Sequence, residues 1–250
     1  MAAPLDPSRT DRAAGEGAGG DWRAYIQLAV PDLAWEFLRR NSDYRTAWRH
    51  AARRPAAIEP RWGLRFAADP KVPAPEAVVF WRPEVAPGLV VPVEPDLGPA
   101  AAEARSWLPD GRSQRADDGL HVRLRDGLQL QYRGAAQPGA PLLVVLRFDQ
   151  DFGLRVHAVE HLNRTVDGRA PPASHLTQAQ RERLAKCLAA LDGVLSGASY
   201  RQIAERLFGQ TMVQAEAWAT SSVRATTIRL VQAGRRMMSG GYLDLIRRGL

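Results

Sequence analysis

Cysteine is almost absent from this chain of 250 residues, and so is any long hydrophobic run. Cys187 is the only cysteine, so no disulfide forms within the chain, and a reducing compartment is the natural setting. No apolar run reaches the roughly 18 residues that a membrane-spanning helix needs. The N-terminal residues also lack the apolar stretch of a secretory signal. These absences predict a cytoplasmic protein without a membrane span.

Motifs for nucleotide binding and covalent catalysis are missing as well. The chain contains neither the phosphate-binding pattern G-x-x-x-x-G-K-[ST] nor the nucleophile motif G-x-S-x-G. The glycines of residues 15–20 follow no strand, so they do not form a dinucleotide-binding loop. We therefore expect no enzyme activity, no catalytic residues and no cofactor.

One metal-binding pattern is present. His157, Glu160 and His161 spell H-x-x-E-H, which on a helix places two histidines on one zinc ion beside a general base. The flanking residues resemble a strand and a turn, and on a strand the two histidines lie about 13 Å apart. That spacing is too wide for one ion, and nothing around Glu205 or Glu216 marks either as a third ligand. The sequence therefore predicts no metal site.

Lysine is scarce too, because Lys71 and Lys186 are the only two, and nearly all of the positive charge is arginine. The formal net charge is +7 and the sequence pI is about 10.3. Such a charge suits a polyanionic partner, and the arginine fork matches phosphates and guanine edges. A genome composition that enriches arginine, alanine and proline explains the same excess equally well.

The N-terminal part divides into a tail and a helical segment. Residues 1–20 are rich in proline, glycine, alanine and charge, and we expect a disordered tail. Residues 21–62 form the N-terminal helical segment, in which Pro31 and Asp32 mark one helix start and residues 44–54 begin a second helical piece. Two short helices with three tryptophans are not stable alone, so we expect them to pack on segments that come later in the chain.

A β-rich domain is expected over residues 63–165. Prolines between residues 55 and 99 disfavour long helices. Apolar and polar residues alternate on both sides of Asp126-Gly127, a pair that favours a hairpin turn. The predicted strands form a small antiparallel sheet and cover residues 77–81, 89–93, 120–125, 128–132, 142–148 and 154–162.

A polar connection at residues 163–175 leads to a helical pattern. We expect an all-α helix-turn-helix domain over residues 173–250, which gives the chain an α+β fold. Ser199 and Gln202 have the spacing of a capping box, and Gly209 can end that helix in the left-handed conformation. Inner faces are expected from Leu184, Leu188, Leu191 and Leu195 in one helix, and from Tyr200, Ile203, Ala204 and Leu207 in the next.

The following helix, residues 221–238, carries the predicted DNA-reading surface. Residues 175–250 hold eleven basic and five acidic residues, and so carry +6 of the net charge. Small, hydroxylated and basic side chains that point outward suit the major groove and its phosphates. The candidate DNA contacts are Ser222, Arg224, Thr226, Thr227, Arg229, Arg235 and Arg236, with Arg247 and Arg248 as further phosphate contacts.

Two observations keep a purely structural interpretation open. Capped amphipathic helices such as residues 199–209 also occur in many ordinary helical cores. Residues 210–220 are longer than the three or four residues of a usual helix-turn-helix turn, and we expect Trp218 to pack this insert onto the core.

The chain also resembles a known family in two places. Its C-terminal part is similar to the helix-turn-helix domain of regulators of α-proteobacterial integrative and conjugative elements. The matching landmarks are HLTQAQRERL at 175–184, YRQIAERLFG at 200–209, Trp218, and RLVQAGRRMMSGGYLDLIRRG at 229–249. The stretch WEFLRRNSDYRTAW at 35–48 resembles the "transcriptional regulator" segment that precedes this domain in the same group.

This resemblance implies an excision-activator type of transcription factor, which turns on the gene for a recombination directionality factor. Small antiactivators of that family contain only the C-terminal type of domain, so the longer layout of this chain favours the activator. The expected partners are double-stranded promoter DNA, RNA polymerase, a small antiactivator and a second copy of the chain. The alternative is an antiactivator or other protein-binding module that sequesters a regulator, which an exposed apolar groove would favour over a basic face.

Overall fold

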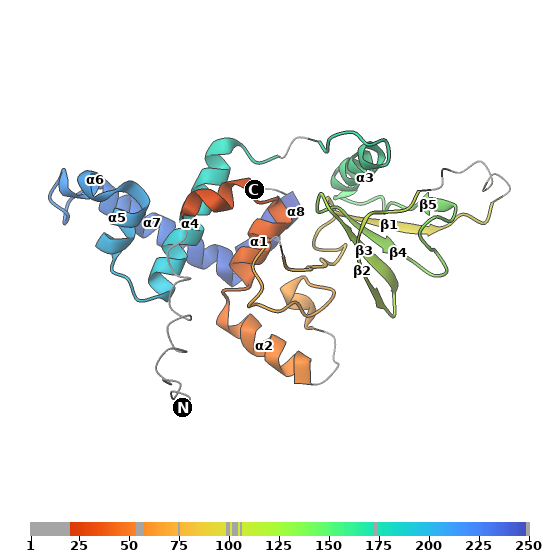
Figure 1. Ribbon diagram of the computed structural model, residues 1–250, viewed down its shortest axis with the longest axis horizontal. Coiled ribbons are helices and arrows are strands. Elements are labelled where there is room, and N and C mark those ends of the chain that lie inside the picture. Colours follow the sequence, from red (N-terminus) through yellow and green to blue (C-terminus); the bar gives the residue numbers. More distant parts are fainter. Residues whose placement is uncertain are drawn as a thin grey trace, which may run out of the picture. The chain divides into compact units, whose positions relative to one another are not determined.

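The computed structural model describes residues 21–53, 58–74, 76–98, 101, 105, 107–172 and 175–248, so the expected tail at residues 1–20 lies outside it (Figure 1). It contains helices and a five-stranded sheet, which confirms the α+β fold. Contacts divide the chain into two compact units. The helical unit comprises Met1–Gln27 and Gln178–Arg236, and the sheet unit comprises Leu28–Thr177 and Met237–Leu250. The four-part division expected from the sequence, into a tail, a helical segment, a β-rich domain and a helix-turn-helix domain, stays a prediction.

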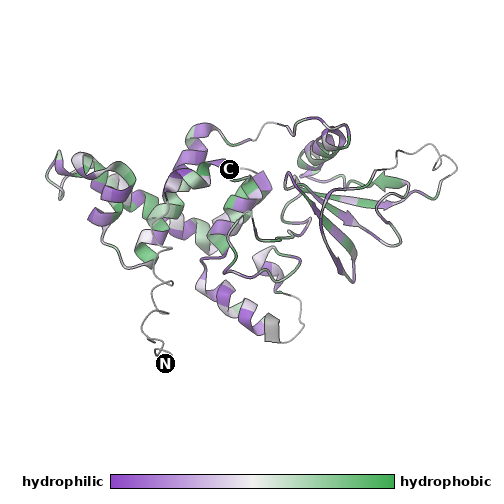
Figure 2. Ribbon diagram, in the orientation of Figure 1, coloured by the Kyte–Doolittle hydropathy of each residue, from purple (hydrophilic) through white to green (hydrophobic). Residues whose placement is uncertain are grey.

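The helical unit is built around one long helix. Helix α4 (Gln178–Leu195) contacts the short 3-10 helix η2 (Trp22–Gln27), α5 (Tyr200–Phe208) and α7 (Ser222–Arg236). The ammonium of Lys186 lies 4.5 Å from the centroid of the Trp22 ring, and the Tyr25 hydroxyl donates to Asp192 over 3.4 Å. Each of α4, α5 and α7 carries hydrophobic and hydrophilic residues on different sides (Figure 2).

Local sequence signals account for the start of α5. The Gln202 backbone N–H donates to the Ser199 hydroxyl over 3.3 Å, and the Ser199 N–H donates to the Gln202 side chain over 2.9 Å. The predicted capping box is therefore confirmed. Gly209 has φ 89° and ψ 151°, so it ends α5 with a positive φ but not in the left-handed helical conformation. The expected inner faces are buried except at Leu195 and Tyr200, which are exposed near helix ends.

Glycine permits the close approach of α4 and α7. A Cβ added to Gly234 would lie 2.7 Å from the Cys187 carbonyl oxygen and 3.1 Å from the Leu191 Cβ atom. Cys187 is buried between these helices, and burial raises the pKa of its thiol to about 11 against the smaller opposing effects of Arg183 and Arg236. The thiol therefore stays protonated and packs as an apolar group.

The sheet unit places one five-stranded sheet beside several helices. Its strands are β1 (Val90–Pro95), β2 (Gly111–Ala116), β3 (Gly119–Leu124), β4 (Gln129–Tyr132) and β5 (Leu142–Val144), in the order β2-β3-β4-β1-β5. β1 and β4 pair in parallel, whereas the other three pairs are antiparallel, so the expectation of a purely antiparallel sheet is wrong in one place. The predicted hairpin at Asp126-Gly127 connects β3 to β4, and Gly127 adopts a positive φ of 92° there.

Three strand predictions need correction. Residues 154–162 belong to helix α3 (Phe152–Val166), because a short apolar alternation also contains a helical set, here Ala158, Val159 and Leu162, that packs on the sheet. Helix α3 also includes residues 163–166, which were expected to begin the polar connection at residues 163–175. Residues 77–81 form no strand apart from an isolated bridge at Trp81. The Gln129 side chain instead donates a hydrogen bond to the Val79 carbonyl and accepts one from the Trp81 backbone N–H. The strand predicted at residues 142–148 ends at Val144, and β2 was not predicted.

Aromatic side chains from distant segments hold the rest of the sheet unit. Helices α1 (Val30–Leu38) and α2 (Ser42–Arg53) are accompanied by the 3-10 turn η3 (Pro60–Trp62). The rings of Trp35, Tyr44 and Trp62 meet edge to face with centroids 5.5 to 5.8 Å apart. The π-helical turn η5 (Met237–Gly241) and α8 (Tyr242–Arg248) pack on α1. Trp35, Trp62 and Trp81 are buried, whereas the other four tryptophans are half-buried. No helix in the described part of the chain is long and apolar enough to cross a membrane.

Candidate nucleic-acid interface

Helix α7 presents one buried and one exposed face within the helical unit. Leu230, Val231 and Gly234 are buried against α4 and α5, so the opposite side faces solvent. Of the seven contacts predicted on α7, the structure leaves five exposed and Thr226 half-buried. The exposed ones are Ser222, Arg224, Arg229, Arg235 and Arg236.

Thr227 does not belong to this exposed set. Its side chain is fully buried, and its hydroxyl donates to the Val223 carbonyl one turn earlier over 2.8 Å. A side chain in that position reaches neither base nor phosphate without unpacking α7. Because it is buried, Thr227 is no longer a candidate DNA contact.

The N-terminal end of α7 is held by a local network. The Arg224 backbone N–H donates to the Ser221 hydroxyl over 3.1 Å, which caps the first turn. The Ser222 backbone N–H donates to the exposed Glu216 carboxylate over 3.3 Å. This carboxylate sits where the partial positive charge of the helix end favours an anion. Sequence reasoning missed this role of Glu216, which only the fold of the preceding loop reveals.

Among the residues that the structure describes, the arginines of α7 have no acidic partners. The helix carries Arg224, Arg229, Arg235 and Arg236 and no acidic residue. Among the described residues none of the four forms an ion pair, and Arg229 donates only to the neighbouring Thr226 hydroxyl over 3.2 Å. Exposed guanidinium groups without carboxylates keep their charge and donors available for a phosphate or a base edge.

One exposed side chain on the same face was not singled out from the sequence. Gln232 is exposed and follows Arg229 by three residues, so it lies one turn further along the same side of α7. A glutamine amide can bond adenine in a bidentate manner. The sequence signal that could have identified Gln232 is its helical spacing, because Ala225, Arg229 and Gln232 fall on the same side of α7.

The connection between α5 and α7 is unlike a usual helix-turn-helix turn. Residues 209–221 contain the short helix α6 (Gln210–Gln214), whose Val213 is buried, and a turn that ends at Ser221. Trp218 is half-buried in that turn. α5 and α7 still contact each other and α4, so three helices pack together despite the long connection.

The C-terminal arginine Arg247 is not available in the same way. It belongs to α8 in the sheet unit, where its guanidinium forms an ion pair with Asp151 and donates to the Glu84 carbonyl over 3.1 Å. A carboxylate partner neutralises the charge that a phosphate contact needs. The expectation of a phosphate contact is therefore weakened at Arg247.

The H-x-x-E-H motif lies on a helix, so the strand spacing that argued against a zinc site is wrong. His157 and His161 are one turn apart on α3, but His161 Nε2 lies 3.0 Å from Asp126 Oδ2 and the His157 ring packs on His175 with centroids 4.5 Å apart. The two imidazoles thus have different partners. Within the described residues no group of three or more His, Cys, Asp or Glu side chains is arranged to hold a metal ion.

Comparison with protein families gives two matches. Residues 145–247 match the family described as "T6SS, Transcription factor, DNA binding domain". Residues 19–67 match the "Proteobacterial transcriptional regulator-like domain". No curated protein matches the chain. The two matches support a transcription regulator that contains a DNA-binding domain, with DNA as its partner, and neither description names an enzyme.

Proposed function

We propose that this chain is a transcription activator that binds promoter DNA sequence-specifically through α7. The observation that carries this proposal is the exposed arginine set of α7, which has no carboxylate partner among the described residues and lies within the stretch that matches a DNA-binding domain. The resemblance to excision activators supports the assignment of its target genes to excision or transfer of a mobile element. The protein acts in the cytoplasm, without enzyme activity and without a cofactor or metal.

The N-terminal half of α7 is the reading surface in this proposal. Arg224, Thr226 and Arg229 contact base edges or the nearest phosphates, with Ser222 at the helix start. Arg235 and Arg236 contact phosphates further along and position the helix without specifying sequence. Gln232 joins the candidate base contacts. A homodimer, RNA polymerase and a small antiactivator remain proposed partners.

The test uses the full chain and a DNA site obtained by binding-site selection. Fluorescence anisotropy across a salt series from about 50 to about 200 mM should show affinity that falls steeply with salt, because each phosphate contact releases counterions. Replacing Arg224 and Arg229 by alanine should weaken binding at least about tenfold. It should also make the log–log salt slope shallower by about 0.9 for each phosphate that the variant no longer neutralises.

A matched control removes the same charge elsewhere. Arg112 and Arg115 are exposed on β2 in the sheet unit, and their double replacement by alanine should leave affinity within about twofold. Equal losses in both double variants would contradict the assignment of α7.

The alternative function is sequestration of a regulator by an antiactivator-like module. Protein that ignores every selected DNA at low salt but binds a homologous regulator would establish this alternative and overturn DNA binding. Binding sites that map to secretion genes rather than to a mobile element would overturn the proposed target genes while leaving DNA binding intact.

A further inference from the structure

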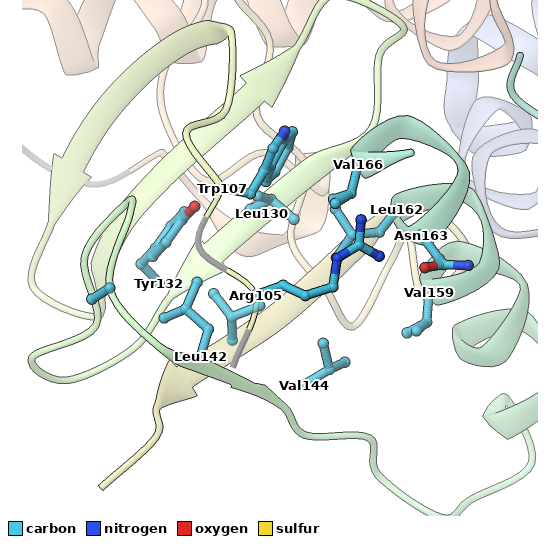
Figure 3. A pocket seen from close by; sticks show the side chains of 12 residues that line it. Arg105, Trp107, Leu130, Tyr132, Leu142, Val144, Val159, Leu162, Asn163 and Val166 are labelled. Carbon is cyan, nitrogen blue, oxygen red and sulfur yellow. The ribbon is translucent and has the colours of Figure 1, made fainter. Parts of the chain in front are cut away.

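The cavity in the sheet unit does not specify a ligand. It lies between one face of the sheet and helix α3, has a volume of about 230 Å³, and is lined mostly by aliphatic and aromatic side chains (Figure 3). Its polar lining residues Arg105 and Asn163 are exposed, and the Tyr132 hydroxyl is closed off from solvent. This lining selects no particular occupant, whereas the exposed side of α7 carries a different chemical group at each turn.

One row of exposed side chains runs the whole length of α7. Successive residues of an α-helix are about 100° apart around the axis, so residues three and four apart line up along one side. Five exposed residues at this spacing fall within an arc of roughly 80° and form what we call the exposed stripe: Ser222, Ala225, Arg229, Gln232 and Arg236. The stripe has no interruption by a buried residue, so a DNA groove can contact it along its length.

The three middle members of the exposed stripe match three different base edges. The Ala225 methyl group suits the C5-methyl group of thymine. An arginine such as Arg229 bonds guanine O6 and N7 in a bidentate manner, and a glutamine such as Gln232 bonds adenine N6 and N7. Because no two of the three prefer the same base, the exposed stripe favours one order of bases over general affinity for DNA.

Arg229 is held in position for a base contact. Its Nη2 donates to Thr226 Oγ1 over 3.2 Å, and Thr226 is half-buried one turn earlier on α7. A guanidinium has five N–H donors and this bond uses one, so the two donors that guanine needs stay available. Fixing the long side chain in advance also lowers the entropy that binding costs.

The spacing of the three side chains fits neighbouring base pairs. With a rise of about 1.5 Å per residue, Ala225 and Arg229 are about 6 Å apart along the helix axis, and Arg229 and Gln232 about 4.5 Å. Zinc-finger helices contact three successive bases through residues that are likewise about one turn apart. Three base pairs in a row are therefore within reach of the exposed stripe.

We propose that the exposed stripe of α7 reads three successive base pairs, T·A, G·C and A·T, in that order along the helix. The Ala225 methyl group packs on the thymine methyl group, Arg229 bonds the guanine, and Gln232 bonds the adenine. Arg235 and Arg236 contact flanking phosphates and add affinity without sequence preference. This base order rests on the proposed binding of promoter DNA through α7 and adds the sequence that α7 selects.

The experiment determines which bases the full chain selects and which side chain selects each. Binding-site selection with the wild-type chain should give sites in which a G·C pair lies between two A·T pairs. Each of the guanine and adenine preferences should amount to at least about fivefold in affinity. Arg229→Ala should lose the preference at the guanine position only, and Gln232→Ala should lose it at the neighbouring adenine position only.

Modified bases test the same contacts atom by atom. 7-Deazaguanine and 7-deaza-adenine lack the N7 acceptor, and each should weaken wild-type binding about two- to tenfold in a fluorescence anisotropy titration. Arg229→Ala should not distinguish 7-deazaguanine from guanine, nor Gln232→Ala 7-deaza-adenine from adenine. Uracil in place of the thymine removes only a methyl group and should weaken wild-type binding about fourfold or less.

Two control variants remove the same side chains elsewhere. Arg235→Ala removes an exposed arginine about 120° around the helix from Arg229, and should weaken binding to every sequence by a similar factor. Gln214→Ala removes an exposed glutamine of α6 and should leave the adenine preference unchanged.

The outcomes distinguish failure of this base order from failure of the proposed function. Selection that enriches no sequence would overturn sequence-specific binding and the base order with it. Selected sites without a G·C pair between two A·T pairs would overturn the base order alone. An unchanged base preference in Arg229→Ala or in Gln232→Ala would do the same.

Discussion

The arginines with low exposure in the sheet unit differ from those of α7 in the helical unit. Several sheet-unit arginines are held by carboxylates: Arg39 lies 2.8 Å from Glu36, Arg123 lies 2.6 Å from Asp32, and Arg155 lies 3.0 Å from Asp149. In the helical unit the arginines of α7 are exposed and have no acidic partner within the described residues. Net charge alone therefore says little about the partner of this chain, and the unpaired charge on one helix says more.

The units also differ in what holds them together. The sheet unit buries ionic groups among large aromatic side chains, whereas the helical unit brings α4 and α7 together through Gly234 and small apolar contacts. The first arrangement depends on matched charges, and the second depends on the absence of a side chain. Different substitutions should therefore damage each unit.

The largest effect is expected at Glu36. Its buried carboxylate accepts from the Arg39 and Arg40 side chains and, over 2.7 Å, from the Ala74 backbone N–H. Glu36→Ala removes the buried carboxylate that three donors share, and should lower the free energy of unfolding of the sheet unit by about 3 to 5 kcal/mol. Hydrogen exchange in urea, read separately on peptides from α1 and α7, measures this loss.

The control for Glu36 is an exposed ion pair in the helical unit. Arg23 and Asp21 are 67 % and 59 % exposed, so Arg23→Ala should cause no measurable loss. Faster exchange in α7 than in α1 after Glu36→Ala would contradict the assignment of this network to the sheet unit.

Gly234→Ala should produce the next largest effect, now in the helical unit. The added methyl group would meet the Cys187 carbonyl at 2.7 Å, and forcing α4 and α7 apart should cost about 1 to 3 kcal/mol. The same substitution at Gly153, where an added Cβ meets nothing within 4 Å, should be neutral or slightly stabilising. Thermal unfolding monitored by circular dichroism compares the two, and equal midpoints would refute the close contact.

The sequence predicted the parts of this fold that depend on local signals. The capping pair Ser199 and Gln202, the hairpin at Asp126-Gly127 and the helix start at Pro31 each follow from chemistry within a few residues. The exposed face of α7 also follows from helical spacing. These features need no knowledge of distant contacts.

The failures arose where distant residues decide the outcome. Residues 154–162 fit both a strand and a helix, and only their packing on the sheet selects α3. Thr227 was chosen as a DNA contact for its hydroxyl although helical spacing places it on the inner face of α7 with Leu230 and Val231, and the structure buries it there. The cavity beside Tyr132 joins strands and a helix that are separated in sequence, so no local pattern announces it.

The substitution Glu216→Gln should have a smaller effect, which is measured as a change in DNA affinity. Its carboxylate at the start of α7 repels phosphates from the surface that the arginines are proposed to use. Removing the charge should strengthen DNA binding about two- to fivefold at low salt and less at high salt, because salt screens the interaction. Asp21→Asn, which removes an exposed carboxylate far from α7 in the sequence, is the control. A decrease in affinity would show that Glu216 supports the bound form of the loop instead.

The smallest effect concerns pH, and it should be confined to the sheet unit, which contains all five histidines of the chain. Burial, followed by the neighbouring His175, lowers the pKa of His157, whereas Glu160 opposes this effect. The unfolded chain, with a histidine pKa of about 6.5, therefore binds a proton before the folded chain does. The stability of the sheet unit should decline as pH falls through about 6.5 towards the folded pKa.

His157→Gln should remove this part of the pH dependence, and His175→Gln should shift the His157 pKa upwards while burial still keeps it below its ordinary value. NMR titration of the imidazole protons of the full chain measures both shifts directly.

Asp126 titrates in a different pH range from the histidines. Burial raises its pKa, but hydrogen bonds from His161, Leu128 and Thr165 outweigh burial and lower the Asp126 pKa. The stability that these bonds provide disappears only in more acidic solution, below the range in which histidine titrates. A pH dependence near 6.5 that appears equally in α7 would break the separation between the two units.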